Sequence, residues 1–182
     1  VHNPDTCGVA NSGAPCARPW RNDVAGIVQL GYLGQEAVNA LADVLTGAVD
    51  AAGRLPTTSP RRLEDIPAML NYPGENGEVL YGEGLFMGYR AFDKTLTEPL
   101  FPFGFGLSYT TFTFGEPAVS SATVRAGQGL TVTVPVSNTG DRAGDACGQL
   151  YVHHLASIPV RPEQELKGLR RFPLGARPSG EA

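Results

Sequence analysis

Residues 81–112 read YGEGLFMGYRAFDKTLTEPLFPFGFGLSYTTF, and this aromatic segment divides the chain. Glycine lets the backbone turn and approach another chain closely, and large rings bury much apolar area. Upstream of the segment, apolar residues recur at helical spacing between Pro- and Gly-rich loops, whereas downstream they alternate. The segment therefore predicts a junction between two domains. Its rings are Phe86, Tyr89, Phe92, Phe101, Phe103, Phe105, Tyr109 and Phe112.

The motifs in this segment resemble those of glycoside hydrolase family 3, the β-glucosidase family. EGLFMGYR at 83–90 and FPFGFGLSYT at 101–110 are similar to the end of the α/β sandwich domain of that family. The sequences GQE at 34–36 and GRLP at 53–56 resemble a helix of the same domain and the connection after it. The resemblance covers residues 12 to about 172.

One helix is strongly indicated upstream of the junction. Between Gln35 and Leu45, apolar residues recur every three or four positions, and Gly47 follows as a stop signal. This pattern predicts an amphipathic helix that covers one face of a sheet. A helix followed by a short connection and an extended segment is typical of an α/β fold.

The other upstream segments carry weaker signals. Prolines and glycines predict loop over residues 1–20, and Asn22 or Asp23 is a suitable cap for a short helix through Val28. Residues 30–34 are compatible with a short strand. Residues 57–80 hold three prolines and few apolar neighbours, so we expect a long surface connection there.

Strand patterns dominate downstream of the junction. Leu130, Val132, Val134 and Val136 alternate with other residues, 138–141 is a turn signal, and 149–152 and 165–172 read as further strands. Several short strands separated by turns predict a β-sandwich. The motifs here are similar to the fibronectin-III-like domain that ends many family 3 enzymes.

The predicted fold class therefore has two parts. Residues 1–112 are expected to form the C-terminal portion of an α/β sandwich domain. Residues 113–182 are expected to form an all-β immunoglobulin or fibronectin-III-like sandwich. A complete sandwich of this type takes roughly 100 residues, so we interpret both parts as truncated.

Composition limits the classes of partner. The net charge is −4, charged residues make up 18% of the chain, and no basic run occurs, which argues against nucleic acid. No apolar run is long enough to span a membrane, and the first residues of the sequence do not show a signal-peptide pattern. We expect a soluble segment internal to a longer chain and leave open whether it is cytoplasmic or secreted. Cys7, Cys16 and Cys147 are interpreted as partly buried free thiols, with a Cys7–Cys16 bridge as the alternative.

The resemblance implies a function and places its catalytic groups elsewhere. Family 3 enzymes hydrolyse β-glucosides or β-xylosides with retention, which requires two carboxyl groups roughly 5 to 5.5 Å apart. The resemblance implies that the nucleophilic Asp lies on a (β/α) barrel and that both it and the acid/base Glu precede Val1. We therefore assign no catalytic, cofactor-binding or metal-binding residue to this chain. It is expected to be inactive alone and to support the active site of a longer enzyme, with that barrel as its partner and a β-glycoside as substrate.

Two alternatives to this function remain: a noncatalytic β-sandwich module that binds carbohydrate or protein, and a truncated reading frame.

Three carboxylates, Glu75, Glu78 and Glu83, would suit sugar binding because they lie in a Gly-rich loop near aromatic rings. We favour solvated charges for Glu75 and Glu78, and a hydrogen bond from the backbone or Arg90 for Glu83. Glu36 is interpreted as a charge at a helix start.

Other candidate groups are interpreted as structural. His153 and His154 are adjacent on a predicted strand, so they point to opposite faces and cannot share a metal; His2 is remote in sequence. The glycines at 82–84 and 104–106 do not continue into a dinucleotide motif, and Ser108 lacks the context of a nucleophile. For one set of aromatic residues, packing between domains is favoured over a sugar subsite: Trp20, Tyr32, Tyr72 and Tyr81.

Overall fold

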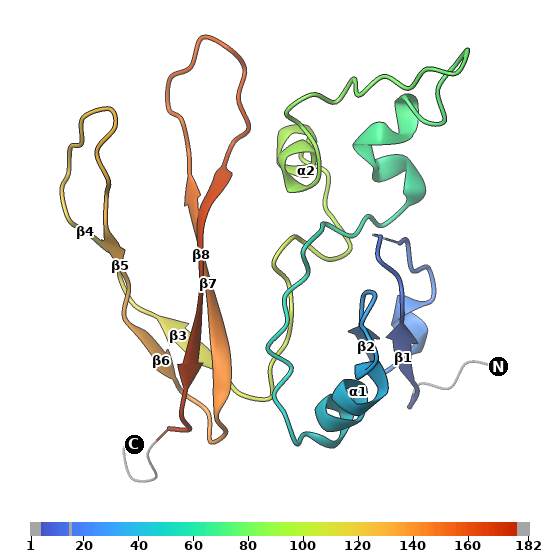
Figure 1. Ribbon diagram of the computed structural model, residues 1–182, viewed down its shortest axis with the longest axis vertical. Coiled ribbons are helices and arrows are strands. Elements are labelled where there is room, and N and C mark those ends of the chain that lie inside the picture. Colours follow the sequence, from blue (N-terminus) through green and yellow to red (C-terminus); the bar gives the residue numbers. More distant parts are fainter. Residues whose placement is uncertain (1–4, 15, 178–182) are drawn as a thin grey trace.

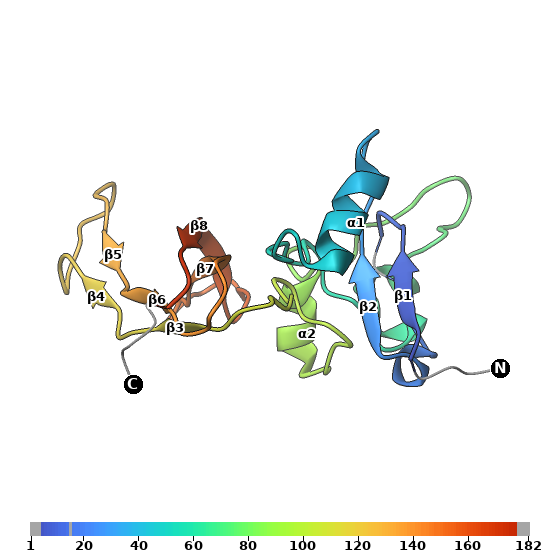
Figure 2. The same ribbon diagram turned by 90° about the horizontal axis from the view of Figure 1, so that it is seen from below.

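The protein structure, a computed structural model, describes residues 5–14 and 16–177. Most of its regular structure is β-strand, with few helices. The chain forms two parts on either side of the aromatic segment, and both views show them side by side (Figures 1 and 2). The described residues do not include 1–4, 15 and 178–182. His2 and parts of the predicted first loop therefore lie outside them.

The first part contains a parallel pair of strands. β1 (Cys7–Ala10) pairs with β2 (Gly26–Gln29) in parallel, and the 3₁₀ helix η1 (Arg21–Asp23) lies between them. Two predictions are wrong here. The expected loop 1–20 contains β1, and the expected helix is only the short η1, because the β-branched residues that follow it enter β2 instead. Their partner strand is distant in sequence, so the local pattern did not show it.

The helix predicted between Gln35 and Leu45 is confirmed. It is α1 (Ala37–Thr46), and Gly47 ends it in the left-handed conformation, with its N–H donating to the Val44 carbonyl at 3.0 Å. The strand expected at 30–34 is absent among these described residues, since Gly31 turns the chain at a φ of 70° after β2. The side chain of Val38 in α1 is 76% exposed, so the described residues cover little of the apolar face of this helix.

The connection to the second part is more ordered than expected. It contains η2 (Leu63–Asp65), η3 (Pro67–Leu70) and α2 (Tyr89–Thr95). The prediction of a surface connection over 57–80 is wrong at its start, because residues 58–60 are buried. The Ser59 N–H donates to the Phe101 carbonyl at 2.8 Å, and the Leu100 N–H donates back to Ser59 at 2.9 Å. The start of the connection is therefore held against the aromatic segment.

The second part consists of antiparallel strand pairs. β3 (Phe112–Phe114) pairs with β6 (Val136–Asn138), β4 (Ala118–Val119) with β5 (Val132–Thr133), and β7 (Gly144–Val152) with β8 (Glu165–Leu174). The predicted strands at 149–152 and 165–172 are confirmed within β7 and β8. The alternation is also confirmed from Val132 to Val136, whose valines are half-buried between exposed neighbours, although the run is split between β5 and β6.

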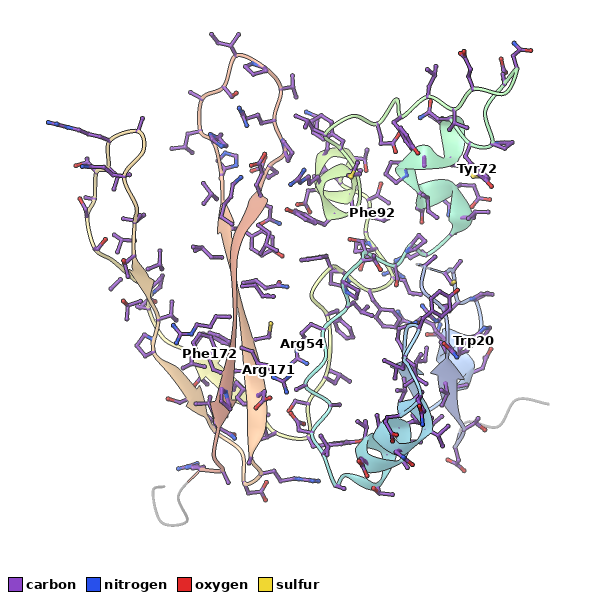
Figure 3. The ribbon with its side chains drawn as sticks, viewed as in Figure 1. Trp20, Arg54, Tyr72, Phe92, Arg171 and Phe172 are labelled. Carbon is purple, nitrogen blue, oxygen red and sulfur yellow. The ribbon has the colours of Figure 1, made fainter. Side chains whose placement is uncertain are left out.

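The side chains of the longest hairpin pack across its strands. Arg171 of β8 donates to the Asp145 carboxylate of β7 at 2.5 Å (Figure 3). The neighbouring Phe172 packs over Gly148, where an added Cβ would lie 3.0 Å from the ring. Glycine at this position in β7 therefore leaves space for the ring.

Buried apolar side chains are scarce in the part of the chain that the structure describes. Ala91, Phe92 and Ala146 are buried, and Phe92 of α2 is 6% exposed (Figure 3). Many larger apolar side chains are exposed instead. None of the described helices is both long enough and apolar enough to cross a membrane.

Replacing Phe92 should therefore remove a major part of this small core. We expect Phe92→Ala to lower the free energy of unfolding by about 3 kcal/mol, because a buried ring leaves a cavity. Leu155→Ala is the control, since that side chain is 94% exposed, and it should change stability by less than about 0.5 kcal/mol. Urea unfolding followed by circular dichroism measures both. Equal effects would show that α2 contributes no core.

Candidate functional site

A carboxylate links the two parts where α1 has just ended. The Ser108 hydroxyl donates to the Asp50 carboxylate, with Oγ 2.8 and 2.9 Å from its two oxygens, and the Tyr109 N–H donates to Oδ1 at 2.8 Å. The Thr110 N–H donates to the Ser108 hydroxyl at 3.1 Å. Asp50 is half-buried. The Ser108 hydroxyl thus has a structural role, and its hydrogen bonds fix the aromatic segment to the first part.

Tyr109 extends this link to the end of α1 and to the strands. Its hydroxyl donates to the Val44 carbonyl at 2.7 Å, and the Arg142 guanidinium lies 5.3 Å from its ring centroid. Arg142, in the turn before β7, also donates to the Gly47 carbonyl. We call Asp50, Ser108, Tyr109 and Arg142 the Asp50 joint. Through it, α1 and the β6–β7 turn are held at a fixed separation.

Glycines allow the backbones to meet near the joint. A Cβ on Gly106 would lie 2.5 Å from the Gly53 carbonyl oxygen, and one on Gly144 would lie 2.8 Å from Asp50 Oδ2. Arg54 lies between the two parts (Figure 3), and its Nη1 donates to the Gly53 carbonyl at 2.9 Å and the Leu107 carbonyl at 3.4 Å. No side chain fits at Gly106 or Gly144 without moving these groups.

A second link connects α2 to the long hairpin. The Leu166 N–H donates to the Tyr89 hydroxyl at 2.9 Å, and Gln164 Nε2 donates to Asp93 Oδ2 at 3.0 Å. The Tyr89 ring contacts Phe103 with centroids 5.3 Å apart and meets Tyr151 edge-on at 5.8 Å. The aromatic segment therefore forms contacts between the two parts of the chain.

Glu165 is a nearly buried acid beside this second link. Lys167 Nζ lies 2.6 Å from its Oε2, and Arg161 Nη1 lies 4.0 Å from its Oε1. The hydrogen bond from Lys167 lowers the pKa of Glu165, burial opposes that shift, and the positive charges of Lys167, Arg90 and Arg161 add to the lowering. Glu165 is therefore held as a carboxylate, which is the opposite of what a general acid needs.

The carboxylates considered for sugar binding do not gather around one point. Glu75 and Glu78 are exposed, as expected for solvated charges, and their backbones bond to each other across a tight turn at 3.0 and 2.9 Å. Glu83 is half-buried and accepts a long hydrogen bond from Asn71 Nδ2 at 3.5 Å. The prediction that the Glu83 carboxylate accepts from the backbone or from Arg90 is wrong among the described residues, since its partner is Asn71 and the Arg90 guanidinium lies over the Tyr89 ring.

The histidines and cysteines provide no metal site in the described residues. His153 and His154 follow the end of β7, so their predicted placement on a strand is wrong. His153 Nδ1 instead lies 3.4 Å from Glu163 Oε1. No group of three His, Cys, Asp or Glu residues among those described could hold a metal. The prediction of three free thiols is confirmed, although Cys7 and Cys16 are exposed rather than partly buried.

The remaining candidates lie at the surface. Glu36, the residue before α1, accepts from Asn39 Nδ2 at 2.5 Å, in keeping with its interpretation as a helix-start charge. Trp20 packs on Gly8, whose added Cβ would lie 3.0 Å from its ring. Tyr32, Tyr72 and Tyr81 are exposed. These three tyrosines are not packed between the two parts of this chain, and their packing between domains stays a prediction.

Comparisons with known proteins assign this architecture to a class, the C-terminal region of a glycoside hydrolase. Residues 1–89 match the model of the glycosyl hydrolase family 3 C-terminal domain. The chain is 48% identical to a β-glucosidase of Rhizobium radiobacter over 99% of its own length and 22% of that protein. It is 43% identical to a probable β-glucosidase I of Aspergillus fumigatus over 93% of its length and 21% of that protein. The chain thus spans about a fifth of the curated relatives it matches.

Solved structures extend the match through both parts. A Bifidobacterium adolescentis GH3 β-glucosidase superposes with a TM-score of 0.89 at 40% identity, over 96% of this chain and 26% of that one. β-Glucosidase 3B of Thermotoga neapolitana, solved with glucose, gives 0.85 at 38% identity over 93% and 24%. The chain therefore belongs to glycoside hydrolase family 3, as the sequence motifs indicated, and corresponds to a C-terminal part of its β-glucosidases.

Removing the Asp50 carboxylate should loosen the connection between the parts. We expect Asp50→Ala to lower the free energy of unfolding by about 2 kcal/mol, because it leaves the Ser108 hydroxyl and the Tyr109 N–H without their charged acceptor. Asp141→Ala is the control, since that residue is exposed in the nearby β6–β7 turn. Urea unfolding compares the two variants. A loss in Asp50→Ala no larger than in the control would contradict a role for the joint in stability.

The lowered pKa of Glu165 makes its contribution depend on pH. The folded-state pKa lies below the unfolded value of about 4.3, so the stabilisation is fully present above that pH and is lost as pH falls through the folded pKa. We expect Glu165→Gln to be less stable than wild type at neutral pH, with a gap that narrows as the solution becomes more acidic than about pH 4. Exposed Glu116→Gln is the control. Urea midpoints across this pH range test the effect, and a constant gap would refute it.

Proposed function

We propose that this chain is the C-terminal segment of a retaining glycoside hydrolase that cleaves β-glucosides or β-xylosides, and that the segment supports the active site without supplying catalytic groups. The observation that carries the proposal is the continuous similarity to β-glucosidases over 93 to 99% of the chain. The superpositions run through both parts at TM-scores of 0.85 and above. The relatives' reaction is thus the best guide to the reaction of the whole protein.

The proposal includes a finer division of the fold. Residues 1–112 would be the end of an α/β sandwich domain, and residues 113–182 an incomplete fibronectin-III-like domain. The parallel pair β1–β2 with α1 supports the first assignment. The antiparallel pairs from β3 to β8 support the second. The full enzyme would add a (β/α) barrel before this segment, and the β-glycoside would bind through that larger assembly.

The two catalytic carboxyl groups would then precede Val1. Retaining hydrolysis needs a nucleophilic carboxylate and a second carboxyl group that is held protonated. In this chain, the Asp50 carboxylate is used by the joint, and Glu165 is held ionised by Lys167. Glu75 and Glu78 are exposed on a turn. These environments suit structural and solvated charges, which supports a noncatalytic role for the segment.

The role of the segment would be to hold surfaces in fixed relation. Catalytic groups and the residues that position a substrate tolerate little displacement, since misplacement by about 1 Å can cost a large factor in rate. The Asp50 joint and the Tyr89 link tie the parts at two separate places. A tie at two places resists rotation about either one. The segment would therefore be a rigid structural support for the rest of the enzyme.

Hydrolysis of an aryl β-glucoside tests this function. We expect the purified 182-residue chain to release no nitrophenol above the buffer control. The same chain extended upstream to its natural start should release it, because it would regain both carboxyl groups. Activity in the short chain would contradict the noncatalytic assignment. Lack of activity in a folded extended chain, tested on both a glucoside and a xyloside, would contradict the proposed reaction and favour a binding module.

A further inference from the structure

One asparagine of the chain is followed directly by glycine. Of all the asparagines in the sequence, only Asn76 has this neighbour, Gly77. The carbonyl carbon of an asparagine side chain can be attacked by the backbone nitrogen of the next residue. Glycine shields that nitrogen least, because it has no Cβ. The pair therefore has the chemistry for spontaneous loss of the side-chain amide.

The structure places this pair at the centre of a tight turn. Asn76 and Gly77 take φ angles of 53° and 80°, and the backbones of Glu75 and Glu78 exchange hydrogen bonds of 3.0 and 2.9 Å. Positive φ at both central residues defines a type I′ turn, for which asparagine followed by glycine is a preferred pair. We call residues 75–78 the 75–78 turn.

Both reacting groups of the 75–78 turn are open to solvent. Asn76 and Gly77 are exposed, and a Cβ placed on Gly77 would meet no atom within 4 Å. The N–H groups of Glu75 and Glu78 form the hydrogen bonds of the turn, whereas the Gly77 N–H forms none with the residues that the structure describes. Figures 1 and 2 show the segment between η3 and α2 projecting away from the other elements. The attacking nitrogen is therefore neither covered nor held by a hydrogen bond within the described chain.

Asn138 provides a contrast within the same chain. Its Nδ2 donates to two backbone carbonyls at 2.7 and 2.9 Å, so its side chain is held in place. The residue after it is Thr139, whose N–H donates to the Thr111 carbonyl at 2.8 Å. Asn138 therefore differs from Asn76 in the residue that follows it and in the hydrogen bonds that restrain both groups.

We propose that Asn76 is a site of spontaneous deamidation in this protein. The Gly77 nitrogen attacks Cγ of Asn76, the new C–N bond closes a succinimide ring, and the bond from Cγ to Nδ2 breaks. The leaving nitrogen takes up the proton lost from the Gly77 N–H and departs as ammonia. Water then opens the ring at one of its two carbonyl carbons and leaves a carboxylate. Water is the only co-reactant.

The two products change the 75–78 turn in different ways. Opening of the ring at Cγ gives aspartate, whose new negative charge lies between the exposed carboxylates of Glu75 and Glu78. Opening at the main-chain carbonyl gives isoaspartate, in which the backbone runs through Cβ and Cγ and gains one carbon. The hydrogen bonds of the turn depend on the length of a two-residue connection, and aspartate followed by glycine also suits that connection. We therefore expect isoaspartate to disrupt the turn and aspartate to retain it.

Peptide mapping by mass spectrometry tests the site. The folded 182-residue chain is kept at mildly alkaline pH, where the attacking nitrogen loses its proton more readily, and the conversion of each asparagine is followed over time. We expect Asn76 to convert at least about tenfold faster than Asn138, because conversion at Asn138 first requires two hydrogen bonds to break. Conversion of Asn76 no faster than that of Asn138 would overturn the proposal.

The same chain unfolded in guanidinium chloride separates the effect of the fold from that of the sequence. Asn138 should convert faster when its hydrogen bonds are lost, whereas Asn76 should convert at a similar rate in both states. If Asn76 converts in the unfolded chain and stays an amide in the folded chain, the turn protects it and the proposal fails.

Two variants test the chemistry and its effect on the turn. Asn76→Gln should abolish conversion at this position and leave Asn138 unchanged, because the longer side chain would have to close a larger ring. Asn76→Asp represents the aspartate product and should keep the hydrogen-exchange protection of the Glu78 amide. The isoaspartate fraction separated from the aged wild-type chain should exchange that amide at least about tenfold faster. Equal protection in the two would contradict the proposed effect of isoaspartate on the turn.

Discussion

The Asp50 carboxylate accepts hydrogen bonds from residues that lie 58 and 59 positions further along the chain. It thereby fixes the path by which the chain leaves the first part and enters the strands. The same contact explains why two nearby positions are glycine, since side chains at Gly106 and Gly144 would meet the Gly53 carbonyl and Asp50 itself. The motif around Ser108 and Tyr109 is therefore the sequence of a structural joint.

The charged side chains of the chain fit a structural role. Its best-placed charged groups are engaged in structure, with Asp50 in the joint and Glu165 held ionised between Lys167 and Arg161. Large apolar side chains are exposed on α1 and between η3 and α2. A segment with fixed internal geometry and uncovered apolar surfaces is suited to being one part of a larger folded body. The match to about a fifth of the length of β-glucosidases fits that description.

The sequence predicted the features that depend on local pattern. The helix that became α1 and the alternation around Val134 were visible, because residue spacing and the glycine after the helix determine them. β1 and β2 were missed because parallel pairing joins distant segments and each strand is only four residues long. The role of Asp50 was also invisible, since nothing adjacent to it in sequence indicates a partner beyond residue 100. The FGLSY motif located one side of the joint and gave no sign of the other.

The coupling of the two parts through Asp50 is the central physical claim. Native-state hydrogen exchange of wild type and Asp50→Ala tests it most directly. We expect the variant to lose protection on both sides of the joint, in α1 near Val44 and in β7 near Gly144, while β4 and β5 are unchanged. Loss of protection confined to the residues next to Asp50 would show that the carboxylate is only a local hydrogen-bond acceptor and that it does not couple the two parts.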